Sequence, residues 1–214
     1  MIIGAALSAV LITSYWILLK KNPFEAQSEA SPDSGLIFNA HISYELSKYA
    51  FCDREDYAQI LHNVNPFTYT FKPVRTLYLE EWDVNGFTGF HQRENRIYVA
   101  FRGTLGWKNT KLDLQMQLVD YHLDPRCSQC KVHKGIQTVL ESLYPSVVES
   151  IEATIGIYGT PSQIIVTGHS LGGAIASLCA LLLKRDGYNV RLETFGAFRI
   201  GNDRLAKFAD TEMD

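Results

Sequence analysis

The chain has 214 residues, of which 46% are hydrophobic and 20% are charged, and its formal net charge is -3. This composition is ordinary for a globular protein and can fill the core of one domain, with or without a short appendage. Lysine and arginine never form a run longer than two residues, which argues against nucleic acid or an anionic surface as a partner.

An uncharged apolar stretch covers residues 2–19 and is followed by Lys20 and Lys21. Its length is close to that of a membrane-spanning helix. A cleaved signal peptide would normally have a positive n-region and a nearer cleavage site, whereas a retained anchor with this lysine pair favours a cytoplasmic C-terminal side. A buried helix is disfavoured because the hydrophobicity runs all round. We therefore expect residues 1–19 to be a signal peptide or a signal anchor. The protein would then be secreted, or membrane-anchored facing an extracytoplasmic compartment.

The polar residues 20–35 predict a linker, and a globular pattern fills residues 36–214. Apolar spacing predicts helices over 36–51, 135–156 and 171–185. Alternation and β-branched composition predict strands over 74–82, 87–91, 96–101, 164–166 and 190–195. The order of these elements predicts an α/β fold with a mainly parallel sheet that has helices on both faces.

Two of the four cysteines, Cys127 and Cys130, form a lone C-x-x-C pair in a polar stretch. Without a second pair or nearby histidines, zinc binding is not indicated. In an oxidising compartment the pair predicts a small loop disulfide. A thiol-redox centre would instead require the pair at a helix start after a strand. Cys179 lies in an apolar helical pattern, which predicts a buried thiol.

The segment with the clearest chemistry is Gly168-His169-Ser170-Leu171-Gly172, a G-x-S-x-G sequence. It follows a β-branched strand and opens a long apolar helix, which is the setting of a nucleophile elbow. Such a turn leaves no room for a Cβ at the flanking glycines. The start of the helix favours a developing oxyanion. The alternative is a glycine-rich turn that contains an incidental serine.

A serine nucleophile needs an imidazole base and an acid that orients the imidazole. In α/β-hydrolases both follow the serine, with the acid first and the histidine second. Here every histidine precedes Ser170: His41, His62, His91, His122, His133 and His169. We expect the His169 side chain to point away from the Ser170 hydroxyl and to pack under the turn. The acid and base of the triad are therefore expected beyond residue 214.

A second oxyanion donor should come from a loop that follows an earlier strand. The sequence Phe101-Arg102-Gly103-Thr104 fits, because an apolar strand ends there and Thr104 offers a backbone N–H. An ordinary β-turn is an equal alternative.

Four segments together resemble the class 3 (fungal-type) lipases in order and spacing. They are VAFRGT (99–104), CKVHKGI (130–136), IVTGHSLGGAIASLCALLL (165–183) and TFGAFRIGND (194–203). These lipases are α/β-hydrolases that hydrolyse acylglycerols and related esters without a metal or an organic cofactor. The resemblance implies Ser170 as nucleophile and the amides of Thr104 and Leu171 as the oxyanion hole. It also implies a lid over 105–112 with Trp107, which opens at a lipid–water interface, although an ordinary surface turn is the alternative.

This sequence departs from the family pattern in two places. Phe198 stands where the family usually has proline. The family's acid lies beyond the Gly-Asn block and its histidine further still, so Asp203, Asp210 and Asp214 come too early to be the acid.

The sequence thus predicts a serine ester hydrolase that acts on lipid acyl esters through an acyl-enzyme, like a triacylglycerol lipase. We expect no cofactor, no metal and no nucleic-acid partner, and nothing in the sequence indicates an oligomeric state. The alternative is a non-catalytic lipid-binding pseudo-hydrolase or an inactive fragment.

Overall fold

The computed structural model describes residues 34–52, 67–103 and 117–213. The chain divides into two compact units, residues 1–39 and 40–214. Of the first unit only the beginning of helix α2 (Ser34–Tyr49) is described, so the predicted signal segment lies outside the described residues. No described helix is both long enough and apolar enough to cross a membrane.

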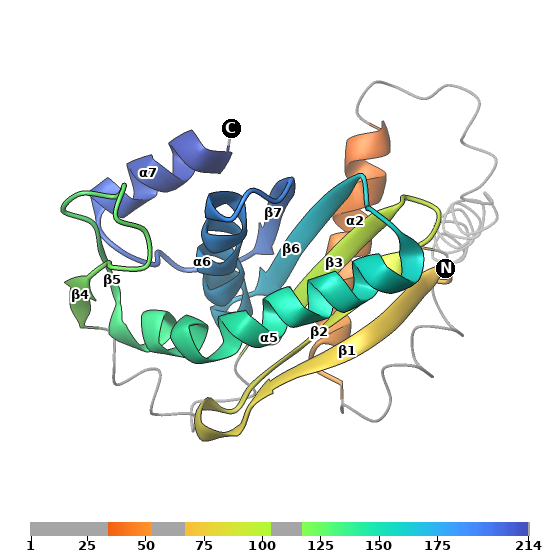
Figure 1. The fold of residues 1–214 in the computed structure, drawn as a ribbon, viewed down its shortest axis with the longest axis horizontal. Coiled ribbons are helices and arrows are strands. Elements are labelled where there is room, and N and C mark those ends of the chain that lie inside the picture. The colour runs from red at the N-terminus through yellow and green to blue at the C-terminus, as the bar shows by residue number, and fades with distance from the viewer. Residues whose placement is uncertain (1–33, 53–66, 104–116, 214) are drawn as a thin grey trace, which may run out of the picture. The chain divides into compact units, whose positions relative to one another are not determined.

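A five-stranded mixed sheet organises the second unit (Figure 1). Its order is β1-β2-β3-β6-β7, and the bounds are β1 (Phe71–Leu79), β2 (Val84–His91), β3 (Arg96–Phe101), β6 (Gln163–His169) and β7 (Val190–Phe195). The strands β1, β2 and β3 pair antiparallel because short turns join them, including the turn at residues 92–95. The strands β3, β6 and β7 pair parallel because a helix precedes both β6 and β7.

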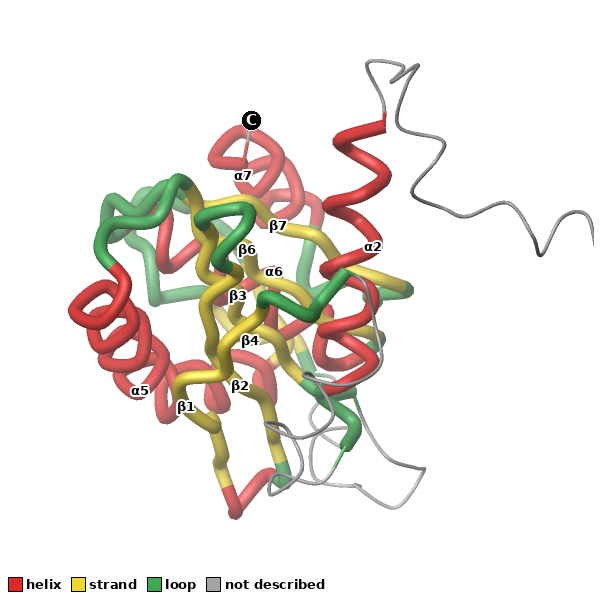
Figure 2. The backbone as a smooth tube through the Cα atoms, turned by 90° about the vertical axis from the view of Figure 1, so that its right-hand side faces the viewer, coloured by secondary structure: helices red, strands yellow, loops and turns green. Residues whose placement is uncertain are grey.

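Helices cover both faces of the sheet (Figures 1 and 2). On one face lie α5 (Lys134–Tyr158) and α6 (Leu171–Arg185), and on the other lies the part of α2 from residue 40 onward. The remaining elements are η3 (Glu80–Trp82), the antiparallel pair β4 (Leu118–Asp120) and β5 (Lys131–His133), and α7 (Asp203–Met213). The predicted α/β architecture with helices on both faces is confirmed, and its sheet is mixed.

The main core lies between the sheet and the pair α5 and α6. Val99 on β3 and Val166 on β6 are fully buried there, together with most of α6. Alternate residues of a strand point to opposite faces. The near-continuous apolar runs of these strands therefore supply one mainly apolar face.

The face beneath α2 combines buried apolar side chains, such as Ile42 and Leu46 on the helix and Ile165 on β6, with buried polar groups. Thr167, the neighbour of Val166, shares a 2.8 Å hydrogen bond with the hydroxyl of Ser47 on α2. Ser43 of the same helix donates to the carboxylate of Glu193 on β7, which also lies 2.8 Å from the guanidinium of Arg191. Hydrogen bonds therefore add to apolar packing in placing α2 on the strands, since buried polar groups need partners.

His91 at the end of β2 is buried and satisfied in its neutral form. Its Nε2 donates to the Phe67 carbonyl over 2.9 Å, and its Nδ1 accepts from the Glu94 N–H over 3.3 Å. Burial lowers the pKa of this imidazole below its ordinary value of 6.5, against a smaller opposite effect of the Phe67 carbonyl.

This environment predicts a loss of stability in mild acid. Below about pH 6.5 the unfolded chain binds a proton at His91 that the folded chain resists, so the free energy of unfolding falls as the pH falls. We expect His91→Gln, which keeps one donor and one acceptor, to flatten this dependence between pH 7.5 and 5. Urea unfolding at several pH values measures it. Replacement of the exposed His122 by glutamine serves as the control. Equal slopes of the free energy of unfolding against pH for wild type and His91→Gln would contradict the prediction.

Candidate active site

Ser170 occupies a single-residue turn between β6 and α6. Its backbone has φ 55° and ψ -120°, a region that non-glycine residues rarely adopt and that costs about 1–3 kcal/mol. Both sides of the residue are held. Its N–H donates to the Phe195 carbonyl at the end of β7 over 3.0 Å, and its carbonyl accepts from the Ala174 N–H over 3.1 Å. The serine therefore lies at the carboxyl end of the parallel strands in a strained conformation that hydrogen bonds on both sides hold in place.

Backbone close approach explains the glycines on either side of the serine. A Cβ on Gly168 would lie 2.4 Å from the carbonyl of Gly172, and a Cβ on Gly172 would lie 2.2 Å from the carbonyl oxygen of Phe101. Because the nearest atoms are backbone atoms in both cases, no change of side-chain rotamer would make room for a Cβ. The first turn of α6 therefore rests directly on the ends of β6 and β3.

The backbone that leaves β3 passes beside the serine. A Cβ on Gly103 would meet the His169 carbonyl oxygen at 2.8 Å and the Cβ of Ser170 at 3.5 Å. The ring of Phe51 is the third neighbour of this position, at 3.0 Å. The structure therefore brings the Phe101–Gly103 segment and the G-x-S-x-G turn together, as a two-sided oxyanion site would require.

Leu171 begins α6 directly after the serine, and its side chain is buried. The first amides of a helix have no acceptor within the helix and carry the positive end of its dipole. No acidic residue lies in the first turn of α6 to neutralise that end. The predicted second donor, Thr104, and the predicted lid 105–112 with Trp107 lie outside the described residues.

The His169 side chain does not pack under the turn. It is exposed, and its ring centroid lies 6.1 Å from that of Phe51. That prediction was wrong because strand alternation continues through residue 169, which places His169 on the same face of the sheet as Thr167 and Phe195, where its side chain stays exposed.

The other described histidines have observed neighbours elsewhere. His91 bonds to Phe67, His122 lies 2.5 Å from Glu141, His133 precedes α5 and meets the ring of Phe198, and His41 stacks on Phe67. The prediction that the triad acid and base lie outside the chain stays a prediction.

Sequence reasoning did not anticipate the role of Arg102, which follows the last residue of β3. Its Nη2 donates to the backbone carbonyl of Asp83 over 2.7 Å and lies 2.9 Å from the carboxylate of the same residue. Its N–H donates to the Asn85 carbonyl over 2.8 Å. A buried arginine thus ties the end of β3 to the turn before β2.

Gly201 and Asn202 pack against β5 and bind its main chain. The Asn202 Oδ1 accepts from the N–H groups of Lys131 and Leu205, and its Nδ2 donates to the Gln129 carbonyl. A Cβ on Gly201 would lie 2.1 Å from the Lys131 carbonyl oxygen. The block therefore fixes the start of α7 against the β4–β5 hairpin.

Cys127 and Cys130 form a disulfide in the loop between β4 and β5, with a Cα–Cα distance of 5.6 Å. Both residues are buried, which does not favour thiol exchange as their role because exchange needs access to a sulfur. Cys179 is fully buried, and burial raises the pKa of its thiol. No group of three or more potential metal ligands occurs in the described part of the chain.

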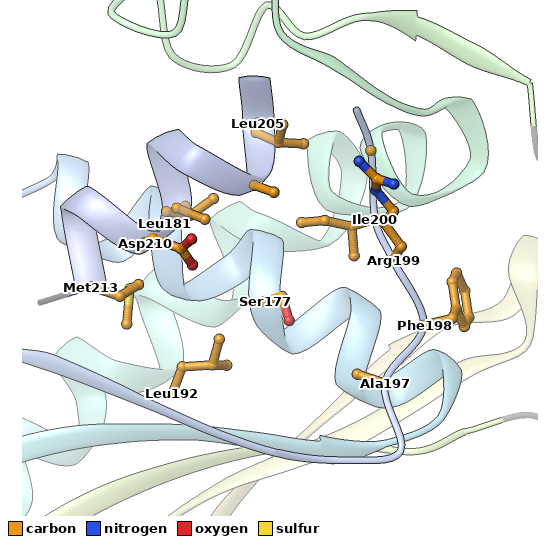
Figure 3. Close-up of a pocket in the computed structure, with 13 residues that line it drawn as sticks. Ser177, Leu181, Leu192, Ala197, Phe198, Arg199, Ile200, Leu205, Asp210 and Met213 are labelled. Carbon is orange, nitrogen blue, oxygen red and sulfur yellow. The ribbon is translucent and has the colours of Figure 1, made fainter. Parts of the chain in front are cut away.

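An apolar cavity of about 290 Å³ lies apart from the serine, between α6, β7 and α7 (Figure 3). Its lining includes Leu181, Leu192, Leu205 and Met213, with Phe198 at one end. Phe198 also contacts the main core and the ring of His133, so the residue that replaces the family's proline serves as a packing residue. Ser170 does not line this cavity.

Comparison with known proteins adds a family to this geometry. Residues 98–214, more than half of the chain, match the model of the class 3 lipases. The chain belongs to the class 3 lipase family. The fold and the resemblance predicted from sequence are thereby confirmed.

Individual members of the class 3 lipase family agree with this assignment. A lipase of Rhizomucor miehei is 36% identical over 149 residues, which cover 66% of this chain and 39% of the relative. A secreted mono- and diacylglycerol lipase of Fusarium solani is 29% identical over 127 residues, which cover 58% and 36%. The structure of a triacylglycerol lipase with a serine protease triad superposes with a TM-score of 0.69 at 29% identity, covering 86% of this chain and 69% of that one. The chain thus spans less than half the length of the Rhizomucor miehei and Fusarium solani lipases.

Gly→Ala substitutions in the elbow and in α5 should change the free energy of unfolding in opposite directions. Gly172→Ala forces a Cβ into the Phe101 carbonyl and should lower the free energy of unfolding by about 1–3 kcal/mol. Gly156→Ala lies near the end of α5 with nothing within 4 Å and should raise it by about 0.5–1 kcal/mol. Urea unfolding of both variants measures the difference, and a wild-type midpoint for Gly172→Ala would refute the close approach.

Proposed function

We propose that this member of the class 3 lipase family is a serine ester hydrolase that acts on lipid acyl esters through Ser170. The observation that carries the proposal is the strained backbone of Ser170 at the start of α6. The turn is held by two close backbone contacts, which are possible only because residues 168 and 172 are glycines. Such strain at one exposed turn is typical of a nucleophile elbow.

The proposed reaction passes through an acyl-enzyme. The Ser170 Oγ attacks the ester carbonyl carbon while a base takes its proton, and the carbonyl oxygen becomes an oxyanion facing the amide of Leu171 and, as we propose, that of Thr104. The alkoxide leaves with the proton, and water then releases the fatty acid and restores the serine. The acid and the base would come from sequence beyond residue 214.

The relatives suggest the substrate class and the setting. One is described as a secreted mono- and diacylglycerol lipase and another as a triacylglycerol lipase, so acylglycerols at a lipid–water interface are the proposed substrates. The Cys127–Cys130 disulfide supports an oxidising, extracytoplasmic location. The lid with Trp107 and the N-terminal signal or anchor remain parts of the proposal.

The rival proposal is a non-catalytic lipid-binding protein, and it draws support from the described histidines, whose observed partners are Phe67, Glu141, Phe198 and Phe51. The two proposals differ in the reactivity of Ser170. An unactivated serine does not react appreciably with a fluorophosphonate, whereas a triad serine does.

The decisive test is fluorophosphonate labelling together with hydrolysis of a soluble butyrate ester. Both are measured on the 214-residue chain and on the chain extended by the codons that follow in its reading frame. We expect labelling of the extended chain that Ser170→Ala abolishes, with hydrolysis reduced by roughly 10⁴-fold or more.

Ser177→Ala is the matched control, since Ser177 lies on the same helix and its hydroxyl bonds to the Gly173 carbonyl. It should keep labelling and activity. A folded extended chain that neither reacts with the probe nor hydrolyses the ester would favour the lipid-binding alternative.

A further inference from the structure

We propose that Arg102 and Asp83 form a positioning pair that holds the end of β3 in place beside Ser170, and so sets the geometry of the oxyanion site. This inference rests on the proposed function. It concerns residues that do not touch the substrate and that act through the Phe101–Gly103 backbone.

The need for such a pair follows from where the strand ladder stops. The last paired residue of β3 is Phe101, opposite Gly86 on β2. Beyond it, the Arg102 N–H reaches the Asn85 carbonyl, and the guanidinium reaches both the carbonyl and the carboxylate of Asp83. These bonds extend the attachment of β3 past its last sheet pair.

Asp83 is itself held in an unusual conformation. It ends η3 with φ 47° and ψ 37°, and its N–H donates to the Glu80 carbonyl over 3.1 Å. This left-handed geometry turns its backbone carbonyl toward Arg102, which then binds the main chain and the side chain of one residue. Hydrogen bonds that involve charged groups are shorter and stronger than neutral ones, so the contact is directional.

Stability alone does not explain a charged pair at this place. Arg102 is only 9% exposed, and its Nε is buried without a hydrogen-bond partner. Arg102 is buried whereas the Asp83 carboxylate is about half exposed, and an ion pair with one buried member often contributes no more stability than apolar residues of similar volume. An unpaired buried donor adds a further cost. What the pair supplies is a defined position for the backbone that it holds.

That backbone is in van der Waals contact with the elbow. Gly172 rests on the Phe101 carbonyl and Gly103 lies against the His169 carbonyl, both at distances that leave no room for a Cβ. Thr104, the proposed second donor, follows directly in the sequence. A displacement of about 1 Å at a catalytic site can lower a rate about 100-fold. Greater mobility of the backbone at residues 101–103 should therefore lower kcat.

The test compares Arg102→Met and Asp83→Asn with Arg75→Met. Arg75 forms an exposed pair with Glu149 at 2.9 Å, on β1 and away from the elbow, so its loss controls for the removal of an arginine ion pair. All variants are made in the polypeptide that hydrolyses the butyrate ester. The measurements are kcat, KM and the thermal midpoint.

We expect Arg102→Met to lower kcat by about 10- to 100-fold with KM within about threefold of wild type. Asp83→Asn should lower kcat less, and the double variant should match Arg102→Met, because the two residues act as one pair. Arg75→Met should leave kcat unchanged.

A second measurement separates positioning from general loosening. A thionoester places sulfur where the ester places the oxyanion, so it responds less to well-placed oxyanion donors. The ratio of kcat/KM for the ester over that for its thiono analogue should fall about 10-fold in Arg102→Met, whereas general loosening lowers both rates equally.

Folded variants with wild-type kcat and a wild-type ratio would overturn the inference. If Arg102→Met fails to fold, the partly exposed Asp83 allows Asp83→Asn to decide. Full activity in Ser170→Ala would instead overturn the proposed function. Loss of activity in Ser170→Ala, with no change in either member of the pair, would overturn the positioning role alone.

Discussion

The contact between the first turn of α6 and the end of β3 is the constraint on which the site depends. The Cα of Gly172 approaches the Phe101 carbonyl so closely that any side chain would collide with it. Because the helix begins this close to the sheet, the chain must turn from strand to helix within one residue, and Ser170 takes the strained backbone that results. The close packing of α6 on the end of β3 therefore places the serine at the carboxyl edge of the sheet.

The two faces of the sheet contribute differently to that arrangement. The face toward α5 and α6 is mainly apolar, and α6 is buried along nearly its whole length, so its position is set by close packing. The face toward α2 is joined by hydrogen bonds from Ser43 and Ser47 to Glu193 and Thr167. Apolar packing fixes the distance between helix and sheet, and the polar contacts add direction.

Attachments outside the sheet ladder hold the segments that flank the elbow. Arg102 ties the end of β3 to the turn at Asp83, while Asn202 ties the loop after β7 to β5. Both use side chains with several donors or acceptors to bind main-chain groups of another segment. The segments beside the strained turn at Ser170 are thus held by residues that lie on quite different parts of the chain.

Much of this was determined by the sequence itself. Hydrophobic periodicity and β-branched composition placed α6 and β7 at their observed bounds. The glycines around Ser170 indicated a close approach, because only the absence of a Cβ explains their spacing. Only the tertiary structure decided the exposure of His169, the mixed pairing of the sheet and the partner of Arg102. Each depends on contacts between residues far apart in the sequence, such as Arg102 with Asp83 or Thr167 with Ser47, and local patterns carry no information on which distant groups will meet.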